Sequence, residues 1–440
     1  MLTLLSTLSL RAADYVITDY GATTDTTRLS TAAIQAAIDA CADHGGGRVV
    51  VPAGMFKSGS IRLRSHVNLY LETGATLYGS TRLEDYRQMK SDYVSLRTQT
   101  TTIQLVYADQ ADDVTISGQG TIDGRGAAFV KQSWNDEGIT RPHLLRFICC
   151  CDVTVSGVTL RNSGCWMQHY LACDHVRISG IKVFNRNNYN NDALDLDGCH
   201  DVVVSDMIAD SDDDAITLKS TSPRLCENVT ISNCVVSSHC NAIKLGTETN
   251  GGFRNISISH CIVKPSAYQD SQFFGDPSKR GTSAVSLEIT DGGVLENVVV
   301  ADIVVEGTES PIFIRLGNRA RGYREGLPVE GVGTIRDVYL HDIFVRGAGS
   351  TGSSITGLPG HPVENVFLSN IHIQQQGGCQ ELEAPLDEKE KDYPEATMWG
   401  KLPAKGFFVR HARHVVFRDV TITTTAEDLR PEFVKVDVED

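Results

Sequence analysis

The sequence repeats one pattern three times, as Asn191-Asp192-Ala193-Leu194-Asp195-Leu196-Asp197, Asp213-Asp214-Ala215-Ile216-Thr217-Leu218-Lys219 and Cys240-Asn241-Ala242-Ile243-Lys244-Leu245-Gly246. Each copy has a polar pair, a small residue, and then apolar and polar residues in alternation, which is typical of a half-buried β-strand. If the copies stack as neighbouring strands, equivalent residues lie about 4.8 Å apart. Stacking therefore predicts two rows of side chains, Asp192 with Asp214 and Asn241, and Asn191 with Asp213 and Cys240.

A related signature, a polar residue followed by Val or Ile and alternating apolar residues, recurs along most of the chain. It begins at Asp113, Asp152, His175, Asp201, Asn228, Asn255, Asn297, Asp337, Asn365 and His414. The short intervals fit one turn of a solenoid, and the long intervals fit a turn that carries an insertion. Sandwiches and propellers pair neighbouring strands through tight hairpins, whose Asn-Gly and Asp-Gly signals are not spaced through this chain. We therefore expect an all-β protein, a parallel β-helix of about ten coils.

A helix is predicted before the first coils, over residues 31–41, because Ile34, Ala37, Ile38 and Cys41 keep a spacing of three to four residues. We expect this helix to cap the N-terminal end of the coil. Residues 14–440 are interpreted as a single domain, with insertions at about 264–280, 318–333 and 374–405 that project from the solenoid and wall a groove.

Composition limits the class of protein. The 440 residues include 41% hydrophobic and 22% charged residues, enough for a large core, and a formal charge of -15 argues against nucleic-acid binding. Residues 1–13 combine an apolar run with small residues and resemble the remnant of an export signal. No later run is apolar and long enough to span a membrane. We expect an exported soluble monomer, periplasmic or secreted.

The twelve cysteines show neither C-x-x-C pairs nor a regular metal-site spacing. Cys151, Cys173, Cys199 and Cys226 recur at one place in the repeat, which favours small buried residues stacked inside the coil over a metal site. We expect no metal and no cofactor. The disulfide state stays open.

Four motifs together resemble glycoside hydrolase family 28, the polygalacturonases and rhamnogalacturonases. They are Asn190-Asn191-Asp192, Asp213-Asp214 before Ala-Ile, the His239 region before Gly246-Thr247-Glu248, and the opening Tyr20-Gly21-Ala22. The resemblance covers the chain from about Asp19 to about Phe417. It implies a right-handed β-helix and a metal-free, inverting hydrolysis of pectic glycosides.

By position in these motifs, Asp213 matches the family's general acid, and Asp192 and Asp214 match the carboxylates that activate water. The chemistry of the residues agrees with these roles. Inverting hydrolysis needs a protonated carboxyl at the leaving oxygen and an ionised carboxylate that activates water. Clustered acids repel one another's ionisation, so at least one of them is expected to hold a proton near neutral pH.

The sequence departs from the family pattern at two motifs. The family's Gly-His-Gly falls on His239-Cys240-Asn241, so His239 is displaced by one residue. The family's Arg-Ile-Lys falls on Ser286-Leu287-Glu288, which removes both cations expected to hold a uronate carboxylate. The hypothesis at this point is that Lys244 and Arg315 carry the relocated charge, and that Glu288 accepts hydrogen bonds from a neutral sugar.

Further substrate-binding candidates are Asn190 in the first motif and Lys219, which keeps its place on the second strand. Trp166 on the preceding coil either stacks on a sugar ring or is buried. Arg319, beside an insertion, either binds substrate or braces its loop.

The leading functional hypothesis is an inverting hydrolase of pectin-type polysaccharides or oligosaccharides, with rhamnogalacturonan or another substituted pectic glycan favoured over plain polygalacturonan. Two alternatives stay open. One is a calcium-dependent polysaccharide lyase, with calcium on the acidic cluster and Lys244 or Arg315 as base. The other is a non-catalytic β-helix module that binds carbohydrate.

Overall fold

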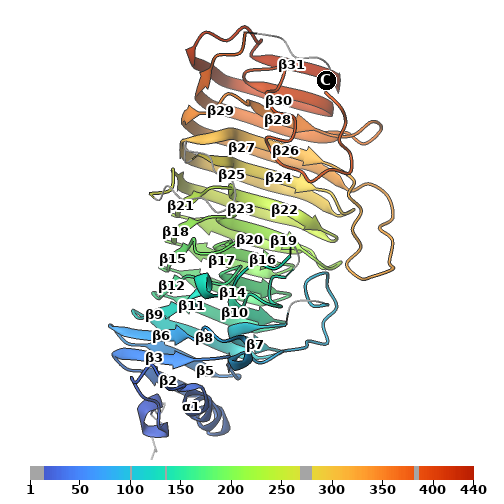
Figure 1. Ribbon diagram of the computed structural model, residues 1–440. Coiled ribbons are helices and arrows are strands. Elements are labelled where there is room, and N and C mark those ends of the chain that lie inside the picture. The colour runs from blue at the N-terminus through green and yellow to red at the C-terminus, as the bar shows by residue number, and fades with distance from the viewer. Residues whose placement is uncertain (1–13, 100–101, 134–135, 268–279, 381–385) are drawn as a thin grey trace, which may run out of the picture.

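The computed structural model describes residues 14–99, 102–133, 136–267, 280–380 and 386–440. The chain folds into a right-handed parallel β-helix, as expected (Figure 1). The predicted remnant of an export signal, residues 1–13, lies outside the described residues. No helix within the described ranges has the length and apolarity needed to cross a membrane.

The strands stack in three parallel ladders along the coil. Ladder A consists of β4 (Ile61–Arg62), β7 (Gln104–Asp109), β10 (His143–Ile148), β13 (Gln168–Leu171), β16 (Leu194–Asp197), β19 (Ile216–Ser220), β22 (Asn241–Thr249), β24 (Gly281–Ile289), β26 (Thr308–Leu316), β28 (Ser353–Thr356), β30 (Phe407–Ala426) and β31 (Phe433–Glu439).

Ladder B consists of β1 (Asp14–Val16), β2 (Gly47–Val51), β5 (Val67–Leu71), β8 (Asp112–Gly118), β11 (Cys151–Ser156), β14 (Asp174–Ser179), β17 (His200–Ser205), β20 (Cys226–Ser232), β23 (Gly252–Val263), β25 (Val294–Glu306), β27 (Thr334–Ala348) and β29 (Val363–Gly377), which also pairs with β30. Ladder C consists of β3 (Gly54–Ser58), β6 (Ala75–Gly79), β9 (Thr121–Asp123), β12 (Thr159–Arg161), β15 (Lys182–Asn185), β18 (Ile208–Ser211) and β21 (Val235–Ser238).

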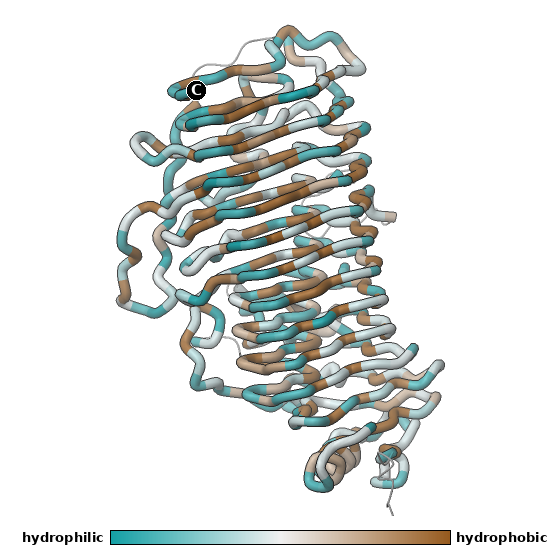
Figure 2. Tube along the Cα trace, turned by 180° about the vertical axis from the view of Figure 1, so that it is seen from behind, coloured by the Kyte–Doolittle hydropathy of each residue, from teal (hydrophilic) through white to brown (hydrophobic). Residues whose placement is uncertain are grey.

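The alternating apolar residues of the repeat point into the coil and form its core. Figure 2 shows apolar and polar residues alternating along the stacked turns. In ladder A, Leu194 pairs with Ile216 and Ile216 pairs with Ile243, and all three side chains are buried. The register predicted from the three repeated segments is therefore confirmed.

The N-terminal end of the coil is covered by α1 (Thr31–Asp43), which lies below the first strands in Figure 1. Its apolar face, Ile34, Ala37, Ile38 and Cys41, is buried as predicted. Short 3-10 turns lie at Ile17–Tyr20, Leu83–Asp85 and Gly126–Ala128.

Polar residues form a row at one corner of the coil, where the backbone is left-handed. Asn228 and Asn255 have φ of 58° and 56°, a region that Asn tolerates better than most residues. The Nδ2 of Asn228 donates to Asp201, and the Nδ2 of Asn255 donates to Asn228, both over 3.0 Å. Side-chain amides thus link successive coils.

The buried cysteine row differs from the predicted one by one residue. Cys151 pairs with Asp174 in ladder B and is half-buried, so its neighbour Cys150 takes the inner place. Cys150, Cys173, Cys199 and Cys226 are buried on successive coils, and all twelve cysteines are free. A run of three adjacent cysteines cannot itself show which one points inward.

Several segments leave the strands. Residues 317–333 separate β26 from β27, and residues 378–406 separate β29 from β30, close to two of the expected insertions. Most of the expected insertion 264–280 lies outside the described residues. Two further segments, 80–103 and 124–142, were not predicted as insertions. Segments 80–103 and 317–333 project on one side of the coil, on the right in Figure 1.

Candidate active site

A pocket of about 440 Å³ opens on ladder A, over the strands of the three repeated segments. Its lining combines strand residues, residues of the short turns before the strands and residues of the four longer segments 80–103, 124–142, 317–333 and 378–406. The lining residues are Arg97, Glu137, Trp166, Asn190, Asp192, Asp213, Asp214, Lys219, Cys240, Thr247, Glu248, Arg319, Arg321, Tyr393 and Glu395. Acidic and basic side chains therefore meet at one site.

The three predicted catalytic carboxylates lie together in this pocket. Asp192 stands two residues before β16, and Asp213 and Asp214 stand before β19, which is the neighbouring strand. Carboxylate oxygens of Asp213 and Asp214 lie within 4.8 Å of each other. The stacking of β16 on β19 is what brings Asp192 to the pair.

Asp214 is the carboxylate that the site keeps ionised. Its Oδ1 accepts hydrogen bonds from the backbone and side-chain nitrogens of Asn241, over 3.1 and 2.8 Å, and its Oδ2 accepts one from Lys244 Nζ over 2.9 Å. Burial alone would raise the pKa of Asp214, but the charges of Lys244 and Lys219 outweigh burial and lower it. Asp214 is therefore suited to accept a proton.

Asp213 has the opposite character. Burial, together with the negative charge of Asp214, raises the pKa of Asp213 to about 7. Its Oδ1 accepts a hydrogen bond from the backbone nitrogen of Asp214 over 2.9 Å. The side chain is only half-buried and lines the pocket. A carboxyl that keeps its proton in about half of the molecules at neutral pH and reaches the pocket can act as a general acid.

Asp192 interacts electrostatically with Asp195, a fully buried acid that does not line the pocket and that the sequence reasoning did not single out. Burial and repulsion from Asp195 and Asp213 raise the pKa of Asp192 well above its usual range. Burial raises the pKa of Asp195 to about 8, although Lys219 Nζ lies 3.6 Å away. The two acids together therefore retain a proton at neutral pH.

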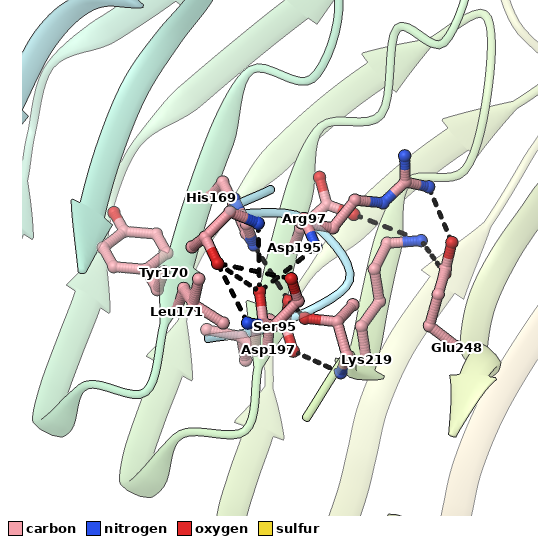
Figure 3. A network of polar contacts seen from close by, with 12 residues as sticks. Ser95, Arg97, His169, Tyr170, Leu171, Asp195, Asp197, Lys219 and Glu248 are labelled. Atoms are coloured by element: carbon pink, nitrogen blue, oxygen red, sulfur yellow. Dashed lines mark hydrogen bonds and ion pairs between the residues drawn. The ribbon is translucent and has the colours of Figure 1, made fainter. Parts of the chain in front are cut away.

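Lys219 lies between these two acids and a second charged cluster, formed by Arg97 and Glu248 (Figure 3). Its Nζ lies 3.4 Å from Glu248 and 3.9 Å from Asp192, and Arg97 donates to Glu248 over 2.6 Å. Arg97 and Lys219 also lie over the ring of Trp166, at 4.5 and 4.6 Å from its centroid. The tryptophan is only 3% exposed, so of the two alternatives left open for it, stacking on a sugar or burial, the structure favours burial under two cations.

Asn190 and His239 differ in their relation to the pocket. Asn190 lines it, and its Oδ1 accepts a hydrogen bond from Arg141 over 2.9 Å. His239 is buried beside the pocket, with Nδ1 2.8 Å from Asp212 Oδ1 and 3.2 Å from Arg186 Nη2. The pocket position next to it is held by Cys240.

Besides His239, which was also a substrate-binding candidate, three predicted substrate-binding residues do not line the pocket. Lys244 is buried and directed at Asp214, with Tyr393 Oη 3.2 Å away. Arg315 is buried beneath residues 386–406, where it donates to the Glu388 carbonyl over 2.6 Å. Glu288 is also fully buried and accepts a hydrogen bond from Ser286. Register alone does not reveal such burial, because the covering segment comes from another part of the chain.

Most of the residues that the sequence reasoning missed come from segments without a periodic pattern. Arg97 lies in 80–103, Glu137 in 124–142, Arg321 in 317–333, and Tyr393 and Glu395 in 378–406. Three others had a signal: Thr247 and Glu248 belong to the Gly246-Thr247-Glu248 motif, and Asp195 lies in the first repeated segment.

One group of pocket atoms has the spacing of a metal site. Ligand atoms of Asp213, Asp214 and Cys240 all lie within 4.8 Å of one another. Calcium prefers six to eight oxygen ligands, and a thiol is a poor partner for it. Burial raises the pKa of the Cys240 thiol, and Lys244 already supplies a positive charge to Asp214. These donors therefore fit calcium poorly.

Known proteins with similar sequences include polygalacturonases. A probable polygalacturonase of Vitis vinifera is 30% identical over 225 residues, 49% of this chain and 46% of that protein. An exo-poly-alpha-D-galacturonosidase of Dickeya chrysanthemi is 38% identical over 138 residues, 30% of this chain and 22% of that protein. The chain thus aligns with less than half the length of either relative.

Among solved structures, the family 28 exopolygalacturonase of Yersinia enterocolitica superposes with a TM-score of 0.76 at 19% identity, over 98% of this chain and 78% of that one. At this identity the likeness shows the fold alone. The family model of glycosyl hydrolases family 28 matches residues 41–386. Since this match extends over most of the sequence and includes Asp192, Asp213 and Asp214, the chain belongs to glycosyl hydrolases family 28.

Proposed function

We propose that this protein hydrolyses glycosidic bonds in pectin-type polysaccharides or oligosaccharides, with Asp213 as general acid and Asp214 as the base that activates water. The observation that carries the proposal is the contrast between these two adjacent acids. The pKa of Asp213 is raised to about 7, whereas the pKa of Asp214 is lowered. Opposite shifts in one pocket supply both proton states that glycoside hydrolysis needs.

In the proposed reaction, Asp213 gives its proton to the glycosidic oxygen as the bond to the anomeric carbon breaks. A water molecule attacks that carbon and gives a proton to Asp214. Lys244, 2.9 Å from Asp214, keeps this base ionised before the attack. Asp192, whose raised pKa leaves it with a shared proton, is suited to orient the same water.

The stereochemical outcome needs a specific arrangement. In most inverting enzymes the acid and the base stand roughly 6.5–9.5 Å apart, so that water fits between sugar and base. Asp213 and Asp214 are closer, with oxygens within 4.8 Å. Taken alone, this spacing is nearer the roughly 5–5.5 Å of retaining enzymes. We propose inversion because Asp192, before the neighbouring strand, also lines the pocket and can hold a water together with Asp214.

The segments around the pocket favour action at a chain end. Gln99 in segment 80–103 donates to the Tyr323 carbonyl in segment 317–333 over 2.9 Å, and the backbone nitrogen of Glu325 donates to Gln99 over 3.2 Å. These contacts join the two segments on one side of the pocket. A polysaccharide that enters a site walled in this way would present its terminus rather than its middle.

The range of substrates follows from which charges reach the pocket. The expectation that plain polygalacturonan is a poor substrate rested on the loss of the two family cations at Ser286 and Glu288 and on Glu288 facing the sugar. Glu288 is buried and does not line the pocket, so it cannot repel a bound uronate directly. The proposal covers rhamnogalacturonan-type, other substituted and unsubstituted pectic chains. Since these polymers lie outside cells, we propose that the protein acts after export.

Neither of the two residues proposed as the base of a lyase, Lys244 and Arg315, is available beside the pocket. Lys244 is paired with Asp214, and Arg315 donates to backbone carbonyls away from the pocket. Elimination would need one of these cations free beside the sugar.

The experiment is a digestion of purified pectic fragments, analysed by mass. Hydrolysis adds one water to each cleavage, whereas elimination leaves an unsaturated product without it. Release of terminal units with the mass of hydrolysis products supports the proposal. Binding of the fragments without cleavage, over the whole set, would overturn it in favour of a carbohydrate-binding module.

A further inference from the structure

The positive charges of the pocket are not equally available to a ligand. Arg97 and Lys219 are both held by Glu248, at 2.6 and 3.4 Å. Arg321 is held by Asp291 at 2.7 Å and lies 3.8 Å from Glu248. Each of these cations therefore has a protein carboxylate that already balances it.

Arg319 is different, because it makes no ion pair within the described parts of the chain while it lines the same pocket. Its guanidinium lies over the ring of Tyr393, 4.9 Å from the centroid, and its Nη1 is 3.5 Å from Thr247 Oγ1. Burial, and repulsion from Arg321, lower the pKa of Arg319, although a guanidinium stays charged at any physiological pH. Within the described residues, Arg319 is thus a partly desolvated cation at the pocket wall that feels the charges of Asp291 and Glu248 but makes no direct ion pair.

Such a group is suited to a ligand carboxylate. A guanidinium presents a planar fork of donors that matches a carboxylate in two parallel hydrogen bonds. The aromatic ring of Tyr393 holds the plane of Arg319 from one side, which reduces the freedom lost on binding. A carboxylate placed here would also relieve the cost of burying an unpaired charge.

We propose that Arg319 binds the carboxylate of a uronic acid residue of the substrate, beside Asp213. This inference rests on the proposed function, and it identifies the residue that replaces the two family cations lost at Ser286 and Glu288. The sequence-based hypothesis that the charge is relocated is kept, but it is assigned to a different residue. Lys244 and Arg315 are occupied by Asp214 and by backbone carbonyls, whereas Arg319 faces the pocket.

The test compares an acidic sugar with its neutral counterpart. Galacturonic acid and galactose differ in one carboxylate, and titration calorimetry measures the binding of each to the wild type and to Arg319→Gln. The loss of a charge-assisted pair in Arg319→Gln should weaken the binding of galacturonic acid by roughly 10- to 100-fold and leave the binding of galactose unchanged. Arg319→Lys, which keeps the charge without the fork, should fall between the two. The exposed Arg324 of the same segment supplies the control, as Arg324→Gln.

Kinetics on an oligogalacturonide and its methyl ester then separate this inference from the proposed function. Arg319→Gln should raise KM for the free acid and leave kcat and the ester nearly unchanged. Equal losses on acid and ester, or unchanged binding of galacturonic acid, would overturn the assignment of Arg319 while hydrolysis stands. A wild type that binds galacturonic acid through Arg319 without cleaving either substrate would instead overturn the proposed function. Should Arg319→Gln fail to fold, Arg319→Lys decides the same comparison.

Discussion

Lys244 donates a hydrogen bond to Asp214, over 2.9 Å between Nζ and Oδ2, at the bottom of the pocket where both side chains are buried. The lysine stands one coil beyond the aspartate, on the strand that stacks on β19. This pair explains why the pKa of Asp214 is lowered while the pKa of its neighbour Asp213 is raised. It also turns a residue expected to bind substrate into one that tunes the base.

Replacing the lysine should therefore change the base rather than substrate affinity. In Lys244→Met, the pKa of Asp214 should rise, because burial is no longer opposed by the nearest cation. The acidic limb of kcat/KM should move to higher pH, with little change in KM. Folding should lose about 3–5 kcal/mol, the usual effect of removing one partner of a buried pair. Activity profiles and denaturant unfolding measure both effects.

The sign of the stability effect depends on pH. Since the folded pKa of Asp214 is lowered, its stabilisation by Lys244 is present above the usual aspartate pKa and is lost as pH falls through the folded value. The difference in the free energy of unfolding between wild type and Lys244→Met should thus become smaller at acidic pH. Lys182→Met, at an exposed lysine of β15, is the control. A variant whose main defect is a raised KM would show that Lys244 contacts substrate after all.

The pH dependence of kcat/KM should report Asp213 on its alkaline side. The acid works only when protonated, and its pKa in the free protein is about 7. The value of kcat/KM should therefore fall as pH rises through about 7, with the slope expected when a single group loses its proton. A pH profile on a neutral oligosaccharide avoids titration of the substrate. Constant activity well into the alkaline range would exclude Asp213 as the acid.

Inversion can be read directly from the first product. Attack by water on the face opposite Asp213 should release a sugar of the opposite anomeric configuration, before mutarotation mixes the two forms. Proton NMR of a fresh digest distinguishes them. A product with the configuration of the substrate would mean that an aspartate, not water, attacks first.

Chelation should leave the rate unchanged, since every proposed step uses a carboxyl group. The assay compares the protein before and after exhaustive treatment with EDTA, with a zinc-dependent hydrolase as positive control for the treatment. Lost activity that calcium restores would favour the calcium-dependent lyase over the hydrolase.

The sequence predicts the fold and the clustering of the candidate catalytic carboxylates because both follow from one periodic pattern. Apolar residues such as Leu194, Ile216 and Ile243 must all face the core, and a shift by one residue would expose them. This fixes the register and brings Asp192 and Asp214 together. In the run of three cysteines no such pattern exists, so the predicted inner residue was wrong by one position.

The rest of the site depends on segments between strands, whose sequences have no repeating pattern. Arg97 reaches the pocket from 80–103, which lies between β6 and β7. Residues 386–406 bring Tyr393 against Lys244 and Trp399 over Arg315, with the Arg315 guanidinium 5.1 Å from the Trp399 centroid. An outward-facing residue on a strand can be exposed or covered, and only the fold of the covering segment decides. Arg319 was noted in the sequence, but its role could not be chosen there.

The most direct test of the account is Asp213→Asn, assayed for new reducing ends together with the wild type on the best pectic substrate. The amide keeps the shape of the side chain but cannot donate the proton, so the rate should fall by roughly 10²- to 10⁴-fold. The melting temperature should not drop, and the exposed Asp206→Asn should stay fully active. More than about a tenth of the wild-type rate in Asp213→Asn would contradict the central claim that Asp213 is the general acid.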